Sequence, residues 1–262
     1  MPERGLILAG ANDAVEFLGH PELGTRQFVF IEPQSGPFAR LEANFAGTPN
    51  VTLVNTALGA EPGEGSLRLA SFDQSASLLE RGLHLELYPI EFEGQQPVRI
   101  ETLDTIMAAI PGEFDEMVLD VQGYELEVLK GAVETLKAMR RIKCEVNEAE
   151  VFRGCPMVGE IDAFLAPFGL ERTETDLHGG CWGDAVYTRQ SWRRRTGRNV
   201  AVLAGRIARR TGAAHLGPAA LFRWQSPRGY SDQVGASCSC QIDVRRTSSN
   251  FQPSAVRTWS QS

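Results

Sequence analysis

The stretch that most constrains how this chain of 262 residues can fold is residues 118–132 (VLDVQGYELEVLKGA). Residues 117–121 are apolar apart from Asp120, which is typical of a parallel strand covered on both faces. Gly123 predicts a tight turn directly after this strand. A helix is predicted next, because apolar residues recur at helical spacing: Leu126, Leu129, Val133 and Leu136.

Two acidic side chains stand where this strand gives way to the helix. Asp120 lies at the carboxyl end of the predicted strand, and Glu125 lies in the first helical turn, where a carboxylate suits the positive end of the helix dipole. Ligands of open α/β sheets bind at the carboxyl ends of the strands. The acids therefore indicate a functional site, and the alternative is that Asp120 only caps the following helix.

Apolar runs and helical patterns alternate along the rest of the first 191 residues. Strands are predicted near residues 5–10, 28–33, 51–55, 98–103 and 142–147, and the helices between them carry apolar stripes. Residues 66–70 alternate like an antiparallel excursion, and residues 170–175 and 184–188 form two strands around a glycine-rich loop. This order predicts an α/β fold with a doubly wound, mostly parallel sheet and a terminal antiparallel hairpin.

Two short segments of this predicted sheet are typical of a nucleotide site. Gly10 and Asn12 lie in a small-residue loop after the first strand, where glycine lets a ligand approach the backbone. Glu32 ends the second strand about 20 residues later, where an acid can accept hydrogen bonds from a ribose diol. The polar residues 71–77 are interpreted as a loop over the site, with a solvated loop as the alternative.

Charge divides the chain near residue 191. Residues 1–191 hold 14 basic and 31 acidic side chains, and residues 192–262 hold 12 basic and 2 acidic ones. We predict a folded domain over 1–191 and a basic, partly disordered tail over 192–262. The tail's amphipathic stretch at 199–210 could associate weakly with anionic surfaces, although a solvated appendage is the preferred interpretation.

The chain shows no sign of membrane insertion or export. It has no apolar run long enough to span a bilayer and no signal-peptide pattern at its start. Its five cysteines have no paired metal-binding spacing and suit a reducing compartment. We therefore expect a cytoplasmic protein with no transmembrane segment, no nucleic-acid partner and no metal site of cysteines.

The segment at residues 119–132 (LDVQGYELEVLKGA) resembles the central motif of the FkbM-family methyltransferases. Four further segments match in the family's order: 10–13 (GAND), 31–33 (IEP) followed by 38–41 (FARL), 55–59 (NTALG) and 101–104 (ETLD). The resemblance extends over about residues 6–189. It implies a class I, Rossmann-like fold with seven strands, and an enzyme that uses S-adenosylmethionine and mostly methylates hydroxyl oxygens.

The resemblance also implies roles for individual residues. Gly10 and Asn12 would approach the amino-acid part of the cofactor, and Glu32 would hold its ribose hydroxyls. The adenine region would lie beside two residues, Thr56 and Ala57. Asp120 would face the sulfonium end of the cofactor and Glu125 the acceptor.

A hydroxyl acceptor needs a base, and three carboxylates are available. We predict Glu125 or Asp120 as the base, with Glu145 orienting the acceptor. Crowding of these acids would raise one of their pKa values toward the working range. Asp120, Glu145 and Asn147 could instead hold a magnesium ion, an alternative with less support.

The predicted function is O-methylation of a small molecule, a sugar or a secondary metabolite. A nicotinamide-dependent dehydrogenase is disfavoured, because the three-glycine dinucleotide fingerprint is absent. Leu8 and Ala14 depart from the family pattern. They motivate the alternative of a degenerate methyltransferase fold that binds a ligand or partner without turnover.

Overall fold

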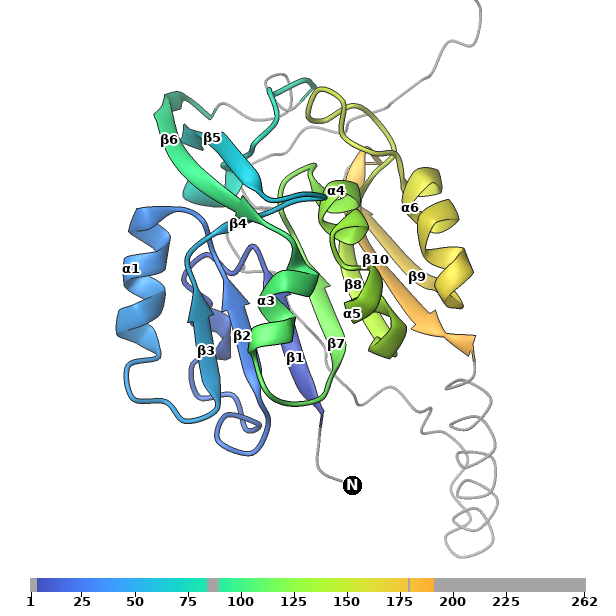
Figure 1. Cartoon of the computed structure of the whole chain (residues 1–262). Coiled ribbons are helices and arrows are strands. Elements are labelled where there is room, and N and C mark those ends of the chain that lie inside the picture. The colour runs from blue at the N-terminus through green and yellow to red at the C-terminus, as the bar shows by residue number, and fades with distance from the viewer. Residues whose placement is uncertain (1–3, 84–89, 179, 191–262) are drawn as a thin grey trace, which may run out of the picture.

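The computed structural model describes residues 4–83, 90–178 and 180–190. Its main sheet has seven strands in the order β3-β2-β1-β7-β8-β10-β9 (Figure 1). Their bounds are β1 Gly5–Ala9, β2 Phe28–Ile31, β3 Val51–Val54, β7 Phe114–Leu119, β8 Arg141–Asn147, β9 Leu170–His178 and β10 Trp182–Arg189. Neighbours from β3 to β8 are parallel, and β10 is antiparallel to β8 and β9. The predicted sheet and its closing hairpin are confirmed.

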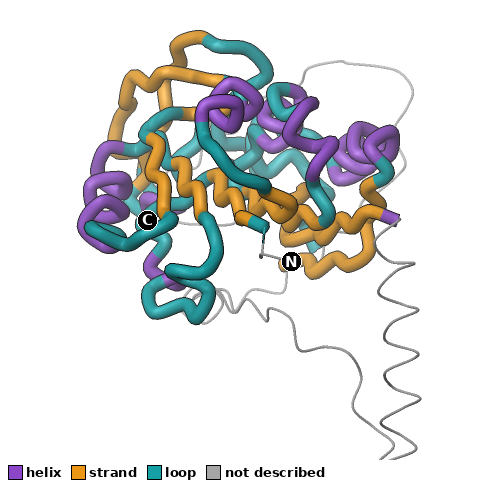
Figure 2. Tube along the Cα trace, turned by 60° about the horizontal axis from the view of Figure 1, so that its bottom comes forward, coloured by secondary structure: helices purple, strands orange, loops and turns teal. Residues whose placement is uncertain are grey.

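Helices cover both faces of this sheet because its central strands are apolar on both sides. One core contains residues of β1 and β2 with Leu41 of α1 (Ser35–Asn44). The opposite core joins the sheet to α3 (Leu103–Ala109), α4 (Glu125–Lys130), α5 (Val133–Ala138) and α6 (Val158–Leu165). The turned view shows the strands as one row with these helices gathered along one side (Figure 2). Short 3-10 turns add η1 Val15–Phe17, η2 Asp73–Ser75 and η3 Ala166–Phe168.

A second, small sheet lies beyond the carboxyl ends of β2 and β3 (Figure 1). It has the order β4-β6-β5, with β4 Ala57–Leu58, β5 Gly63–Ala70 and β6 Phe92–Glu101. The predicted antiparallel excursion is confirmed, since β5 pairs antiparallel with β6. The strand predicted at 98–103 is the end of β6, so it belongs to this small sheet. The small sheet carries loops across the edge where ligands of α/β sheets bind.

The helix predicted after Gly123 is in fact two helices, and part of its predicted stripe is wrong. Gly131 separates α4 from α5, because its backbone packs so closely that a Cβ there would lie 2.1 Å from the Gly59 carbonyl oxygen. The Asp104 carboxylate then accepts hydrogen bonds at 2.8 Å from the Glu134 and Thr135 N–H groups and starts α5. Val133, at this break, is 38% exposed. The side chains buried here are Val128, Leu129, Ala132 and Leu136.

The predicted basic tail, residues 192–262, lies outside the described residues. No helix within residues 4–83, 90–178 and 180–190 is long and apolar enough to cross a bilayer.

Candidate active site

The loop after β1 lies against the end of β7. Gly10 has φ of +81°, and a Cβ on it would lie 1.7 Å from the Asp120 carbonyl oxygen. The Asp120 N–H donates to the Ala9 carbonyl at 3.0 Å, which holds the two strand ends together. Only glycine permits this approach. It brings the predicted cofactor loop, including Asn12 with φ of +48°, next to Asp120.

Glu32 is a buried carboxylate held by two backbone groups. Its Oε2 accepts a hydrogen bond from the Asn12 N–H and its Oε1 accepts one from the Gln34 N–H, both at 2.8 Å. Burial raises the pKa of Glu32 to about 7, although these two N–H groups lower it. Each oxygen keeps acceptor capacity, because a carboxylate oxygen has two lone-pair sites. The group can therefore bind a pair of hydroxyls.

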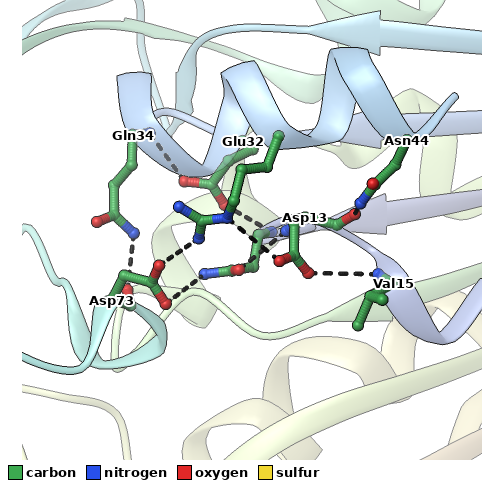
Figure 3. A network of polar contacts seen from close by, with 8 residues as sticks. Asp13, Val15, Glu32, Gln34, Asn44 and Asp73 are labelled. Carbon is green, nitrogen blue, oxygen red and sulfur yellow. Dashed lines mark hydrogen bonds and ion pairs between the residues drawn. The ribbon is translucent and has the colours of Figure 1, made fainter. Parts of the chain in front are cut away.

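A polar network around Glu32 was not predicted from the sequence (Figure 3). The Arg40 guanidinium on α1 bridges Asp13 and Asp73. The Asn12 amide donates to Asp73 Oδ1 at 3.2 Å, and the Gln34 amide donates to the Asp73 carbonyl at 2.8 Å. The loop at 71–77 is thus tied to the cofactor loop and to α1, in agreement with its interpretation as a loop over the site.

Thr56 and Ala57 follow Asn55, just after the end of β3. The Asn55 amide donates to the Glu32 carbonyl at 2.8 Å and keeps the end of β3 beside β2. Thr56 follows, but its hydroxyl already donates to the Arg99 carbonyl at 2.9 Å. Ala57 is buried in the small-sheet core with Val98. The structure therefore places Thr56 near the predicted site and Ala57 in the packing beneath it.

Asp120 and Glu145 meet at the carboxyl ends of β7 and β8. The Gln122 amide nitrogen donates to Asp120 Oδ1 at 2.7 Å and to Glu145 Oε2 at 2.9 Å. Glu145 is buried, whereas the Asp120 side chain is open to solvent. Sequence reasoning missed Gln122. Its signal in the sequence is its position between the predicted strand and Gly123, and in the structure its φ is +55°.

These two carboxyl groups affect each other's pKa. Burial, and then the Asp120 carboxylate, raise the pKa of Glu145 well above its usual range. Desolvation and the Asp184 carboxylate raise the pKa of Asp120. Hydrogen bonds to Gln122 and Glu145 oppose this rise. The neutral form of Glu145 is therefore favoured by its burial and by its neighbour's charge.

Glu125 lies behind this pair and has no exposed surface. Its Oε1 accepts hydrogen bonds from the Val121 and Gly123 N–H groups, both at 3.1 Å. Its Oε2 has no hydrogen-bond partner in the structure. Burial raises the pKa of Glu125 to about 7. Glu125 thus closes the turn that carries Gln122.

Metal-binding geometry is not evident at this edge. Among residues 4–83, 90–178 and 180–190, no three His, Cys, Asp or Glu side chains are grouped as ligands. The magnesium alternative of Asp120, Glu145 and Asn147 includes an amide, which this grouping leaves out, and it stays a prediction.

Comparisons with known proteins agree with the sequence resemblance. The family model of the methyltransferase FkbM domain matches residues 9–173. The 2-O-methyltransferase NoeI of Sinorhizobium fredii is 26% identical over 163 residues, which cover 58% of this chain and 67% of that protein.

Two solved structures are also similar at 10% identity. Magnesium protoporphyrin IX methyltransferase of Synechocystis, with bound S-adenosylmethionine, matches 72% of this chain and 71% of its own with a TM-score of 0.41. Aeropyrum pernix fibrillarin, also with S-adenosylmethionine, matches 72% and 69% with a TM-score of 0.43. These scores are too low to add to the fold described above. The family match spans more than half of the chain, and the chain therefore belongs to the FkbM methyltransferase family.

Proposed function

We propose that this chain is an S-adenosylmethionine-dependent O-methyltransferase that acts on a hydroxyl of a sugar or a secondary metabolite. The observation that carries the proposal is one continuous edge of the main sheet, at the carboxyl ends of its parallel strands. The Glu32 carboxylate, held by Asn12, lies at one end of it, and the Asp120–Glu145 pair lies at the other. Gly10 joins the two ends by its contact with Asp120.

The residues around Glu32 fit S-adenosylmethionine. The two carboxylate oxygens retain lone pairs for two ribose hydroxyls, and the Gly10 loop leaves the backbone open to the amino-acid part. Thr56 is proposed to lie beside the adenine, with Ala57 packed beneath it. When bound, the cofactor supplies an electrophilic methyl group next to Asp120.

Asp120 is proposed as the general base. Its side chain is open to solvent, whereas Glu145 is buried, and its Oδ1 is held by the Gln122 amide at 2.7 Å. The bound cofactor would supply the methyl group to the acceptor oxygen, and the electron pair of the broken carbon–sulfur bond would stay on sulfur. The hydroxyl proton passes to Asp120. Gln122 and Glu145 orient Asp120, and much of the remaining catalysis is positioning.

Oxygen as the methylated atom is supported by the S. fredii relative, whose name describes a 2-O-methyltransferase. Glu125 was the other candidate base. Its buried carboxylate faces the backbone of its own turn, so we assign it to positioning that turn.

Calorimetric titration of the full chain with S-adenosylmethionine tests the proposal. We expect binding in the parent and a loss of about tenfold or more in Glu32→Ala, because two charge-assisted hydrogen bonds are removed. Glu42→Ala, an exposed position on α1, is the matched control and should bind like the parent. A folded parent that does not bind would instead support the binding-module alternative.

A further inference from the structure

Asn147, the last residue of β8, has a buried side chain without a hydrogen-bond partner. It is 1% exposed, and both its amide nitrogen and its amide oxygen are unpaired in the structure. A buried polar group left unpaired destabilises a fold, and a native one calls for an explanation. A ligand that supplies the missing partners is such an explanation.

Asn147 shares a sheet face with the candidate active site. Glu145 lies two residues earlier on β8, so the two side chains project to the same side of the sheet. On the neighbouring strand β10, Asp184 pairs with Glu145 and Trp182 pairs with Asn147. Directly paired residues of antiparallel strands have adjacent side chains. An amide, two carboxyl groups and an indole therefore form one patch beside the proposed base.

The Trp182 ring adds a flat apolar surface to this patch. It is half-buried and lies edge to face with His178, with ring centroids 4.9 Å apart. Its apolar body packs on the cluster of Val151, Phe152, Cys155 and Cys181. The negative face of an aromatic ring attracts the C–H groups of a saturated ring, while neighbouring amide and carboxyl groups bind hydroxyls. A ring that carries both kinds of group is a sugar.

The backbone around Asn147 is tied to two neighbouring segments, and its side chain is buried. The Asn147 backbone is bridged to Met157, and the N–H groups of Glu148 and Ala149 donate to the Cys181 carbonyl at 2.8 and 3.2 Å. An acceptor that pairs with Asn147 must displace part of these neighbouring segments.

We propose that Asn147 is an acceptor-positioning residue. Its amide pairs with the hydroxyl adjacent to the one that is methylated, and Trp182 supports the ring. The acceptor is then a pyranoside with vicinal hydroxyls. This inference rests on the proposed function and names the acceptor class of the same site.

The first test measures stability and needs no acceptor. Asn147→Leu in the full chain removes an unpaired amide and keeps most of the volume, so we expect the Tm to rise by about 2–4 °C. Asn44→Leu is the matched control, because the Asn44 amide donates to the Asp13 carbonyl at 2.8 Å. Its Tm should fall. A fall in Tm for Asn147→Leu as well would show that the amide is structural and would overturn the proposal.

The second test measures methyl transfer to methyl glycosides. Methyl α-D-glucopyranoside, methyl α-D-mannopyranoside and methyl β-D-galactopyranoside are compared with their 2-deoxy and 3-deoxy analogues. With an accepting glycoside, Asn147→Ala should lose about tenfold in kcat/KM, mainly through KM, with unchanged S-adenosylmethionine affinity. The loss should disappear with the analogue that lacks the neighbouring hydroxyl, since the pair is already broken.

Equal losses on the parent glycoside and the deoxy analogue would overturn the role of Asn147. Failure of every glycoside, in protein that binds S-adenosylmethionine, would overturn the sugar assignment. Absence of S-adenosylmethionine binding would count against the proposed function itself, and the stability test of Asn147→Leu would still decide whether its amide is structural.

Discussion

Glu32 and Glu125 show how similar local chemistry gives two different roles. Each is a buried carboxylate that accepts two backbone hydrogen bonds, and the pKa of each is raised to about 7. The donors to Glu32 belong to two separate segments, at Asn12 and Gln34, so its charge lies between them. The donors to Glu125 belong to the turn just before it. We therefore propose that Glu32 binds a ligand and that Glu125 shapes its turn.

Cofactor affinity should depend on pH through Glu32. Ribose hydroxyls donate to the deprotonated carboxylate, and burial raises the pKa of Glu32 to about 7 in the unliganded protein. Affinity is therefore full above that pKa and declines below it. From pH 8 to pH 6 we expect the Kd for S-adenosylmethionine to rise about tenfold. Calorimetry at both pH values measures this, and Glu32→Gln, which cannot titrate, should abolish the pH difference.

Substitutions at Glu125 should separate shape from chemistry. Glu125→Gln retains an oxygen that accepts from Val121 and Gly123, so stability and turnover should stay within about threefold of the parent. Glu125→Ala leaves both N–H groups unpaired and should cost about 2 kcal/mol of unfolding free energy. Asp120→Asn should lower kcat by about 100-fold or more. A stable Glu125→Gln variant that has lost turnover would make Glu125 the base.

At the scale of elements, a salt-bridged loop joins the small sheet to the proposed cofactor site. The loop after β5 carries Asp73, which contacts Arg40 on α1 and Asn12 in the β1 loop. These contacts place a third segment over Glu32 (Figure 3). The Arg40 and Asp73 side chains are partly exposed, so the tie is weak and depends on salt.

Loss of this tie should weaken cofactor binding without unfolding the protein. Asp73→Ala removes the side-chain contacts to Arg40 and Asn12, and we expect the Kd for S-adenosylmethionine to rise about threefold to tenfold. Raising the salt concentration to 1 M should move the parent in the same direction. Arg99→Ala removes an exposed ion pair with Glu101 on β6 and serves as the control. Equal affinity of Asp73→Ala and the parent would exclude a role for this tie.

At the scale of the whole molecule, the main sheet is complete at Arg189. Arg189 ends β10 and donates to the carbonyls of Met139, Leu136 and Phe168, which ties the last strand to the end of α5 and to η3. The family match also ends before it, at residue 173. The charge boundary at residue 191 lies two residues after the last described strand. We propose that residues 1–191 form an autonomous domain.

Truncation tests this boundary. We expect the 1–191 fragment to unfold cooperatively with a Tm within about 3 °C of the full chain and to bind S-adenosylmethionine within about threefold. Thermal melts and calorimetry on both proteins provide the comparison. A fragment that aggregates or melts without cooperativity would mean that residues beyond 191 belong to the fold.

The sequence by itself determined the fold class, the order of strands and helices along the chain, and the acids that end the strands. These features depend on periodicity and on neighbours in sequence, as in the apolar run before Asp120 and the turn at Gly123. It also contained the motif of the family, because that motif is one continuous segment.

Only the tertiary structure decided which of these residues meet. The Gln122 amide joins Asp120 to Glu145, and Gln122 and Glu145 are 23 residues apart in the sequence. Arg40 pairs with Asp73, 33 residues farther along the chain. The break at Gly131 likewise depends on contact with Gly59. The burial that raises the pKa of Glu32 and leaves the Asn147 amide unpaired has the same origin. Burial and long-range pairing arise from the packing of segments distant in sequence, whereas hydropathy patterns report only local structure.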